Sequence, residues 1–231
     1  TSNLGILYKD FNNELEARKY WLEAADIYEK AVGPGHLRRC IVLGWAGQSF
    51  LREGNYKESL TTIHRGLQGV FPDFNPRDDY EMPKEMVSAA NETAASLLQY
   101  KATALEARFN ATHATIRDLE SALEHYILSI DLLDSIRFDM AGLETRSYLT
   151  WRLKPSIEGG MRISIQLFAQ SHDPKYEAIV LEMMEKMKAI THLSALAGEK
   201  ALSDLDAASN PWIIKDNALS LEILEYRRQL A

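Results

Sequence analysis

The chain has 231 residues, of which 46% are hydrophobic and 26% are charged, a composition that excludes a mostly disordered protein. Its formal net charge of −7 argues against a nucleic-acid binder, which needs lysine and arginine to offset phosphate charge. The single cysteine, Cys40, excludes a disulfide framework within the chain, and no apolar run approaches the roughly 18–20 residues of a membrane-spanning helix.

These features predict a cytoplasmic protein without membrane contact. The first residues, TSNLG, contain no Met and no charged-then-apolar signal segment. They already stand inside a repeat pattern, so we expect the chain to be a fragment of a longer protein.

A pattern of small and large residues occurs twice in residues 1–70. Leu4-Gly5-Ile6-Leu7-Tyr8 is followed by Ala17, three residues and Trp21, and a shift of 42 residues maps Gly5 to Gly47 and Trp21 to Ile63. L-G-x2-Y on one helix and A-x3-aromatic on the next is the signature of the tetratricopeptide repeat (TPR). Residues 1–70 are therefore predicted to form two long repeats, each an antiparallel pair of helices.

The glycines of this pattern have a predicted role in helix packing. Gly5 and Gly47 leave room for a large side chain of the facing helix, which allows the two helix axes to approach closely. Gly54, in the turn between the helices of the second pair, is expected to take the positive φ that favours a helix-ending turn.

Residues 71–85, FPDFNPRDDYEMPKE, contain three prolines and five acidic residues and are predicted to be a loop. The loop is longer than most connections in such arrays, which favours a function of its own. The alternative is that it only covers an edge of the helical array. Asp78, Asp79 and Glu81 lack the glycine and the bidentate glutamate of a calcium loop, so no metal site is expected there.

Residues 86–204 are predicted to form two further, more divergent helix pairs. We expect helices at 86–108, 117–137, 142–169 and 175–199, the third of them interrupted near Pro155 and Gly159-Gly160. Residues 205–231 are predicted to be a linker and a C-terminal helix that leads toward a missing downstream domain. With about nine helices and no period-two strand pattern, the expected fold is an all-α, right-handed solenoid of antiparallel helix pairs.

The chain resembles two known kinds of repeat region. Its first two repeats, with G-P-x-H at 33–36, resemble the long TPR of kinesin light chains. The later half resembles the region upstream of the caspase-like peptidase domain in bacterial CHAT proteins. The residues that carry this second resemblance are FPDFNP at 71–76, ALEHYILSIDLLDSIR at 122–137, PSIEGG at 155–160, EKMKAITHLSALAGEKA at 185–201 and NALSLEILEYRRQLA at 217–231.

The CHAT resemblance implies a partner-binding or regulatory region of a larger protein rather than an enzyme. The peptidase domain of that family needs a histidine and a cysteine in a caspase-like fold, and those catalytic residues cannot be placed on this chain. His36 and Cys40 lie one helical turn apart, but neither an oxyanion hole nor further zinc ligands accompany them. Cys40 is therefore interpreted as a core residue, and no catalytic residue, cofactor or metal is predicted.

Two other groups of residues remain candidates for binding. Met183, Met184 and Met187 form a stripe that is either core or an adaptable binding surface. The leading helices of the pairs are expected to line the concave face of the solenoid, where a partner binds. The concave-face residues predicted to contact a partner are Ile6, Lys9, Asp10, Ile41, Gln48, Leu51 and Arg52, with Gly44 between them.

The sequence thus supports a non-catalytic scaffold that holds a protein or peptide, with Lys9 and Arg52 as a possible clamp for a carboxylate. Such a scaffold would regulate a C-terminal caspase-like domain. The alternative is a segment that positions substrate for an active CHAT cysteine peptidase or inhibits it. A purely structural spacer, without any partner, is a third hypothesis. Neither the identity of the partner nor the oligomeric state follows from the sequence.

Overall fold

The computed structural model describes residues 1–83, 91–113, 115–139 and 143–204. Within these ranges it contains eight helices and no strand, which confirms the predicted all-α class. The helices are α1 (Ser2–Asp10), α2 (Glu14–Val32), α3 (Leu37–Arg52), α4 (Tyr56–Val70), α5 (Asn91–Thr112), α6 (Arg117–Asp139), α7 (Leu143–Ser171) and α8 (Pro174–Asp204).

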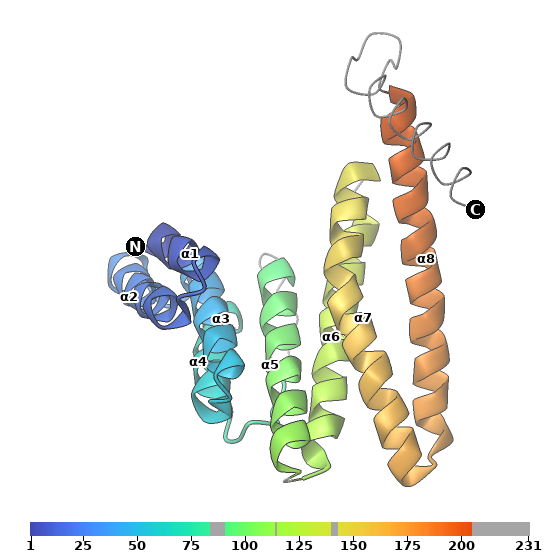
Figure 1. Ribbon diagram of the computed structural model, residues 1–231, viewed down its shortest axis with the longest axis horizontal. Helices are drawn as coiled ribbons and strands as arrows, with labels where there is room; N and C mark the ends of the chain where they lie inside the picture. The colour runs from blue at the N-terminus through green and yellow to red at the C-terminus, as the bar shows by residue number, and fades with distance from the viewer. Residues whose placement is uncertain (84–90, 114, 140–142, 205–231) are drawn as a thin grey trace, which may run out of the picture.

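The helices stack in chain order as four antiparallel pairs, a TPR-like solenoid (Figure 1). The odd-numbered helices lead each pair and the even-numbered ones follow. Each new leading helix packs against the preceding pair: α3 lies on α2, α5 lies on α3 and α4, and α7 lies on α6. Two arginines of α7 bond to residues 56 positions earlier in α5, Arg152 to Ser96 and Arg162 to Glu106. This constant offset shows that the leading helices run parallel to one another.

The small residues of the repeat lie where helices touch, as predicted. A Cβ atom placed on Gly47 would lie 2.5 Å from Cγ1 of Ile63, and one on Gly5 would overlap the indole of Trp21. Trp21 and Ile63 are themselves buried. Gly54 has a φ of 75°, which confirms the predicted turn. The repeat pattern therefore reports real contacts between paired helices.

The predicted interruption of the fourth leading helix is wrong. Helix α7 is continuous from Leu143 to Ser171 and contains Pro155. Pro155 is exposed, where water can bond to the backbone groups that a proline leaves without a helical partner. A Cβ atom on Gly159 would overlap the ring of Tyr126, and one on Gly160 would overlap Met183. These glycines are points of close helix packing and not helix breakers.

The other predicted elements agree with the structure to different degrees. Helix α6 begins at Arg117 as predicted, whereas α5 continues past Asn110, where the pattern loosens, and ends at Thr112. The predicted start at Met86 and the predicted helix in 216–231 lie outside the described residues. The solenoid boundaries at 70, 85 and 204 stay predictions.

The loop at 71–83 covers the surface of α5 and α6. Phe71 and Phe74 are buried in the main hydrophobic core. The hydroxyl of Tyr80 donates to Asp118 at 2.9 Å, and the guanidinium of Arg108 donates to the same carboxylate at 2.7 Å. Residues 71–83 are thus a packed part of the array.

Lys101 of α5 lies beneath this loop and has no solvent exposure. Its Nζ atom donates to the backbone oxygen of Glu81 at 2.7 Å and lies 5.5 Å from the centre of the Phe74 ring. Burial lowers the pKa of Lys101 to about 7, although Asp79, Asp78 and Glu81 act in the opposite direction.

Cys40 is fully buried, which agrees with its interpretation as a core residue. Desolvation raises the pKa of its thiol. His36 stacks on Tyr28, with 5.2 Å between ring centres.

The three methionines of the predicted stripe differ in burial: Met183 is buried, Met187 is partly buried against the core, and Met184 is 42% exposed.

Candidate protein-binding groove

Two adjoining pockets lie along the leading helices of the four described pairs. We call them together the concave groove. The first, of about 270 Å³, lies between α3, α5 and α7, and the second, of about 540 Å³, lies between α1, α2 and α3. Ile41 and Trp45 line both pockets and join them. The first pocket is completed by Gly44, Glu92, Thr93, Ser96, Leu97, Tyr100 and Arg152, and the second by Ser2, Asn3, Ile6, Tyr28, His36, Leu37, Arg38 and Val42.

The sequence of α3 explains why a concavity forms at the first pocket. Ile41, Gly44, Trp45 and Gln48 are spaced i, i+3, i+4 and i+7, so they share one face of the helix. A Cβ atom on Gly44 would lie 3.0 Å from Leu97 and 3.2 Å from the ring of Tyr100. The missing side chain therefore lets α5 approach α3 closely at the base of the pocket.

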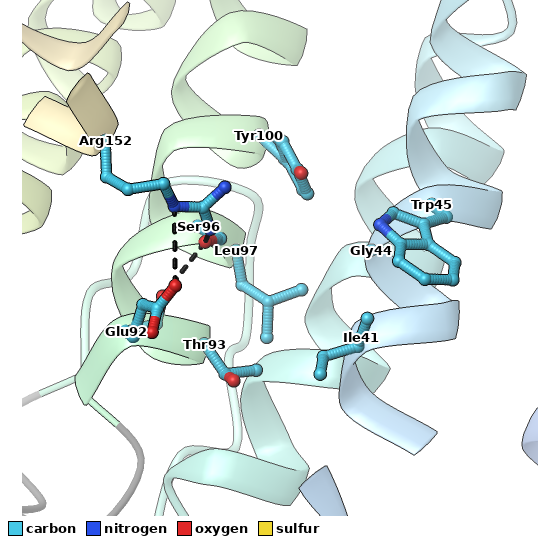
Figure 2. Close-up of a pocket in the computed structure, with 9 residues that line it drawn as sticks. All are labelled: Ile41, Gly44, Trp45, Glu92, Thr93, Ser96, Leu97, Tyr100 and Arg152. Carbon is cyan, nitrogen blue, oxygen red and sulfur yellow. Dashed lines mark hydrogen bonds and ion pairs between the residues drawn. The ribbon is translucent and has the colours of Figure 1, made fainter. Parts of the chain in front are cut away.

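Trp45 forms the apolar wall between the two pockets. Its ring packs at a tilt against the buried Trp21, with 5.8 Å between ring centres, which fixes its orientation. In Figure 2, Trp45 and Ile41 lie on one side of the pocket, across from Arg152 and Tyr100. Aromatic side chains held in this way are frequent anchors at protein interfaces.

Arg152 supplies a cation on the opposite wall. Its Nη2 atom donates to Oγ of Ser96 at 2.6 Å, and its Nε atom lies 3.5 Å from Oε1 of Glu92 (Figure 2). The side chain remains 39% exposed. A guanidinium that is positioned from two sides and still reaches solvent is well suited to bind a carboxylate, because little side-chain freedom is lost on binding.

Polar groups near the groove lack partners within the described part of the chain. The hydroxyl of Tyr100 makes no hydrogen bond there, and burial raises its pKa. The amide nitrogen of Gln48 and Nδ1 of His36 are both buried without a partner. A buried polar group without a partner costs free energy.

The charge of the groove differs from that of the whole chain. Two arginines, Arg38 and Arg152, line the two pockets against one carboxylate, Glu92, although the chain carries a net charge of −7. Arg38 is exposed and makes no ion pair with any described residue. The groove is thus locally basic and attracts acidic groups.

The structure brings only part of the sequence-predicted site together. Ile6 and Ile41 line the pockets, as does Gly44. Gln48 stands one turn further along the same face of α3. Leu51 packs partly buried against the main core.

The charged members of that predicted site lie apart from the pockets. Lys9 and Asp10 are exposed at the end of α1 and line neither pocket. Arg52 forms a two-bond pair with Glu14, with Nε and Nη2 each 2.8 Å from a carboxylate oxygen. Its guanidinium is therefore already engaged by this chain, as that of Arg152 is by Ser96 and Glu92, but Arg52 lines neither pocket. Whether these residues touch a partner stays a prediction.

The sequence-based site missed Trp45, Tyr100 and Arg152. Trp45 follows Ile41 by one helical turn, so the spacing that selected Ile41 also pointed to it. Tyr100 and Arg152 belong to the third and fourth pairs, whose repeat register is too weak to assign inner positions.

Among the described residues, no group of three or more His, Cys, Asp or Glu side chains is placed to hold a metal ion. Within the same ranges, every helix is too short or too polar to cross a bilayer.

Residues 1–38 match the family model for the tetratricopeptide repeat. No curated protein matches the chain significantly. The match supports a TPR-repeat region, and this class of helical repeat is consistent with a protein–protein interaction scaffold.

Proposed function

We propose that this chain is a non-catalytic scaffold that holds a peptide, or an exposed segment of a partner protein, in the concave groove. The observation that carries the proposal is the continuity of the two pockets through Ile41 and Trp45. Together they provide an apolar surface that extends over three leading helices. An extended peptide fits such a surface better than a compact small molecule does, since its side chains enter successive pockets.

The chemistry of the walls indicates the kind of segment that binds. A large apolar side chain packs between Trp45 and Tyr100, and a neighbouring carboxylate pairs with Arg152. Arg38 favours a second acidic residue at the pocket between α1 and α3. The hydroxyl of Tyr100 bonds to the peptide backbone. The proposed ligand is therefore an acidic segment with one or two aromatic or long aliphatic anchors.

A selection of displayed peptides on this chain tests the proposal. We expect enriched sequences to combine Asp or Glu with a large apolar residue. For a selected peptide, Arg152→Gln should weaken binding about 10- to 100-fold, the range for a lost charge-assisted hydrogen bond. Arg52→Gln is a matched control, because Arg52 is likewise about two-fifths exposed and paired with a glutamate.

The comparison of these two variants separates the alternatives. A loss with Arg52→Gln and none with Arg152→Gln would favour the residues predicted from the sequence. Equal binding by both variants and by Trp45→Ala would remove the concave groove as the site. Peptides in which each Asp and Glu is replaced by Asn and Gln measure how much of the binding free energy is electrostatic. This comparison needs no change in the scaffold.

The resemblance to CHAT proteins supports a more specific proposal, in which ligand binding regulates a caspase-like domain of a bacterial, cytoplasmic protein. In a protein that carries both parts, a groove-binding peptide should change peptidase activity, and Arg152→Gln should abolish that response. The alternative is that the array positions substrate or inhibits the peptidase. In that case Arg152→Gln should alter cleavage of a protein substrate even without added peptide.

A further inference from the structure

The later part of the loop, residues 77–83, covers a buried lysine. Lys101 of α5 has no solvent exposure, and its Nζ atom donates to the backbone oxygen of Glu81 at 2.7 Å. Among the described residues, no carboxylate lies within ion-pair distance of this atom. Burying an ammonium group without such a partner costs free energy, so the covering loop disfavours the charged form of Lys101.

The described ionisable groups that face Lys101 come from the loop, α4 and α6. They are Asp78, Asp79, Glu81, His64 and His125. Both histidines are neutral at pH 7, because burial lowers their pKa values to about 4 and about 3. Burial outweighs the three carboxylates at Lys101 and lowers its pKa from 10.5 to about 7. Contact with water would restore the higher pKa, so uncovering Lys101 at neutral pH is accompanied by uptake of a proton.

Ion pairs at the edge of this region hold the loop in place. Arg108 of α5 pairs with Asp79, and Arg117 of α6 pairs with Asp78 at 3.1 Å. Asp79 and Asp78 are 38% and 41% exposed, and Arg117 is 58% exposed. Pairs that reach water contribute little free energy each, so residues 77–83 can separate from the helices without unfolding them.

We propose that residues 77–83 form a proton-linked cover, which opens away from Lys101 as this side chain takes up a proton while the helix pairs stay folded. Phe71 and Phe74 stay buried and keep the start of the loop attached. None of the residues of the cover, nor Lys101, lines the concave groove. The proposal therefore holds whether or not a peptide binds there.

The two pKa values of Lys101 set the pH range in which the cover responds. The ratio of open to closed molecules should rise about fivefold from pH 8 to pH 7, and about 50-fold from pH 9 to pH 7. Below pH 7 the effect of Lys101 levels off, because the covered amine then binds a proton as well. The loop thus responds to pH in the neutral range, where exposed lysines do not titrate.

Acetylation of Lys101 measures how often the cover opens. The full chain receives short pulses of N-hydroxysuccinimidyl acetate, with a free lysine amide as reference, and the products are read by mass spectrometry. Only an uncovered, deprotonated amine reacts. As pH rises, the cover opens less often but more of the open molecules are deprotonated, and the two effects cancel above pH 7. The rate at Lys101 should therefore change less than about twofold between pH 8 and pH 9.5, whereas the reference reacts about 30-fold faster.

Two matched variants test whether the ion pairs hold the cover. Asp79→Asn should speed acetylation of Lys101 about tenfold, the factor for one lost charge-assisted hydrogen bond. Glu53→Gln is the control, because Glu53 is 42% exposed and pairs with the largely buried Arg18 away from the loop. This variant should leave the rate at Lys101 unchanged. Urea below the unfolding transition should raise the rate far less steeply than it raises global unfolding, because little surface is exposed by a local opening.

Four results would overturn the proposal. A 30-fold rise at Lys101, parallel to the reference, would mean that opening takes up no proton. An equal response to Asp79→Asn and Glu53→Gln would mean that the loop pairs do not hold the cover. A urea dependence as steep as that of global unfolding would show that the helices unfold instead. Complete absence of acetylation at Lys101 would show that the cover does not open.

Discussion

Replacing Lys101 by methionine should change the stability of the protein in opposite directions at neutral and at high pH. Lys101 is fully buried, and its ammonium donates to one neutral acceptor, the backbone oxygen of Glu81. Burial lowers its pKa from 10.5 to about 7. The ionisable groups that act on it are Asp78 and Asp79 from the loop, Glu81, His64 of α4 and His125 of α6.

The magnitude follows from the linkage between protonation and folding. Between pH 7 and pH 10.5 the unfolded chain binds a proton at Lys101 and the folded chain does not, so stability rises with pH across this window. A difference of 3.5 pKa units corresponds to a destabilisation of about 5 kcal/mol at pH 7 and close to zero at pH 10.5. Lys101→Met removes this effect but leaves the oxygen of Glu81 without its donor, which costs about 1–3 kcal/mol.

Lys101→Met should therefore stabilise the protein at pH 7 and destabilise it slightly near pH 10. Urea unfolding of both proteins between pH 6.5 and 9.5, followed by circular dichroism, measures the difference. Other groups titrate in both proteins, so the difference isolates Lys101. A constant difference across this range would refute the reasoning, because it would mean that the loop carboxylates compensate fully for the burial of the ammonium.

Three further predictions concern packing and acid sensitivity. Gly47→Leu should lower the free energy of unfolding by about 1–3 kcal/mol or more in urea, because its side chain would overlap Ile63; an unchanged melting temperature would contradict the helix contact. Gly159→Val should destabilise through Tyr126 by a similar amount, and Tyr126→Ala should partly rescue it in a double-mutant cycle. Burial lowers the pKa of His64 to about 4 and of His125 to about 3, so the unfolded chain binds more protons below pH 6.5. Stability should therefore fall as pH decreases from 6.5 toward 4, and His64→Phe should reduce this slope.

The sequence alone determined the class of fold and the contacts within the first two pairs. Gly5 and Gly47 stand in a local pattern in which small and large residues face each other across one hairpin. Such a pattern needs only helical periodicity and short sequence separation to be interpreted. The same reasoning placed Ile41 on the inner face of α3, and it extends to Trp45 one turn further.

Only the tertiary structure decided which distant residues meet. Arg152 bonds to Ser96 across 56 residues because successive leading helices stack in parallel, and the weak register of the later repeats did not reveal that alignment. Two adjacent glycines, such as Gly159 and Gly160, are typical of a helix break. Here the close approach of Tyr126 and Met183 requires glycine inside a continuous helix. Local sequence encodes the helices and their apolar faces, whereas the position of a charge in the concave groove depends on how whole pairs stack.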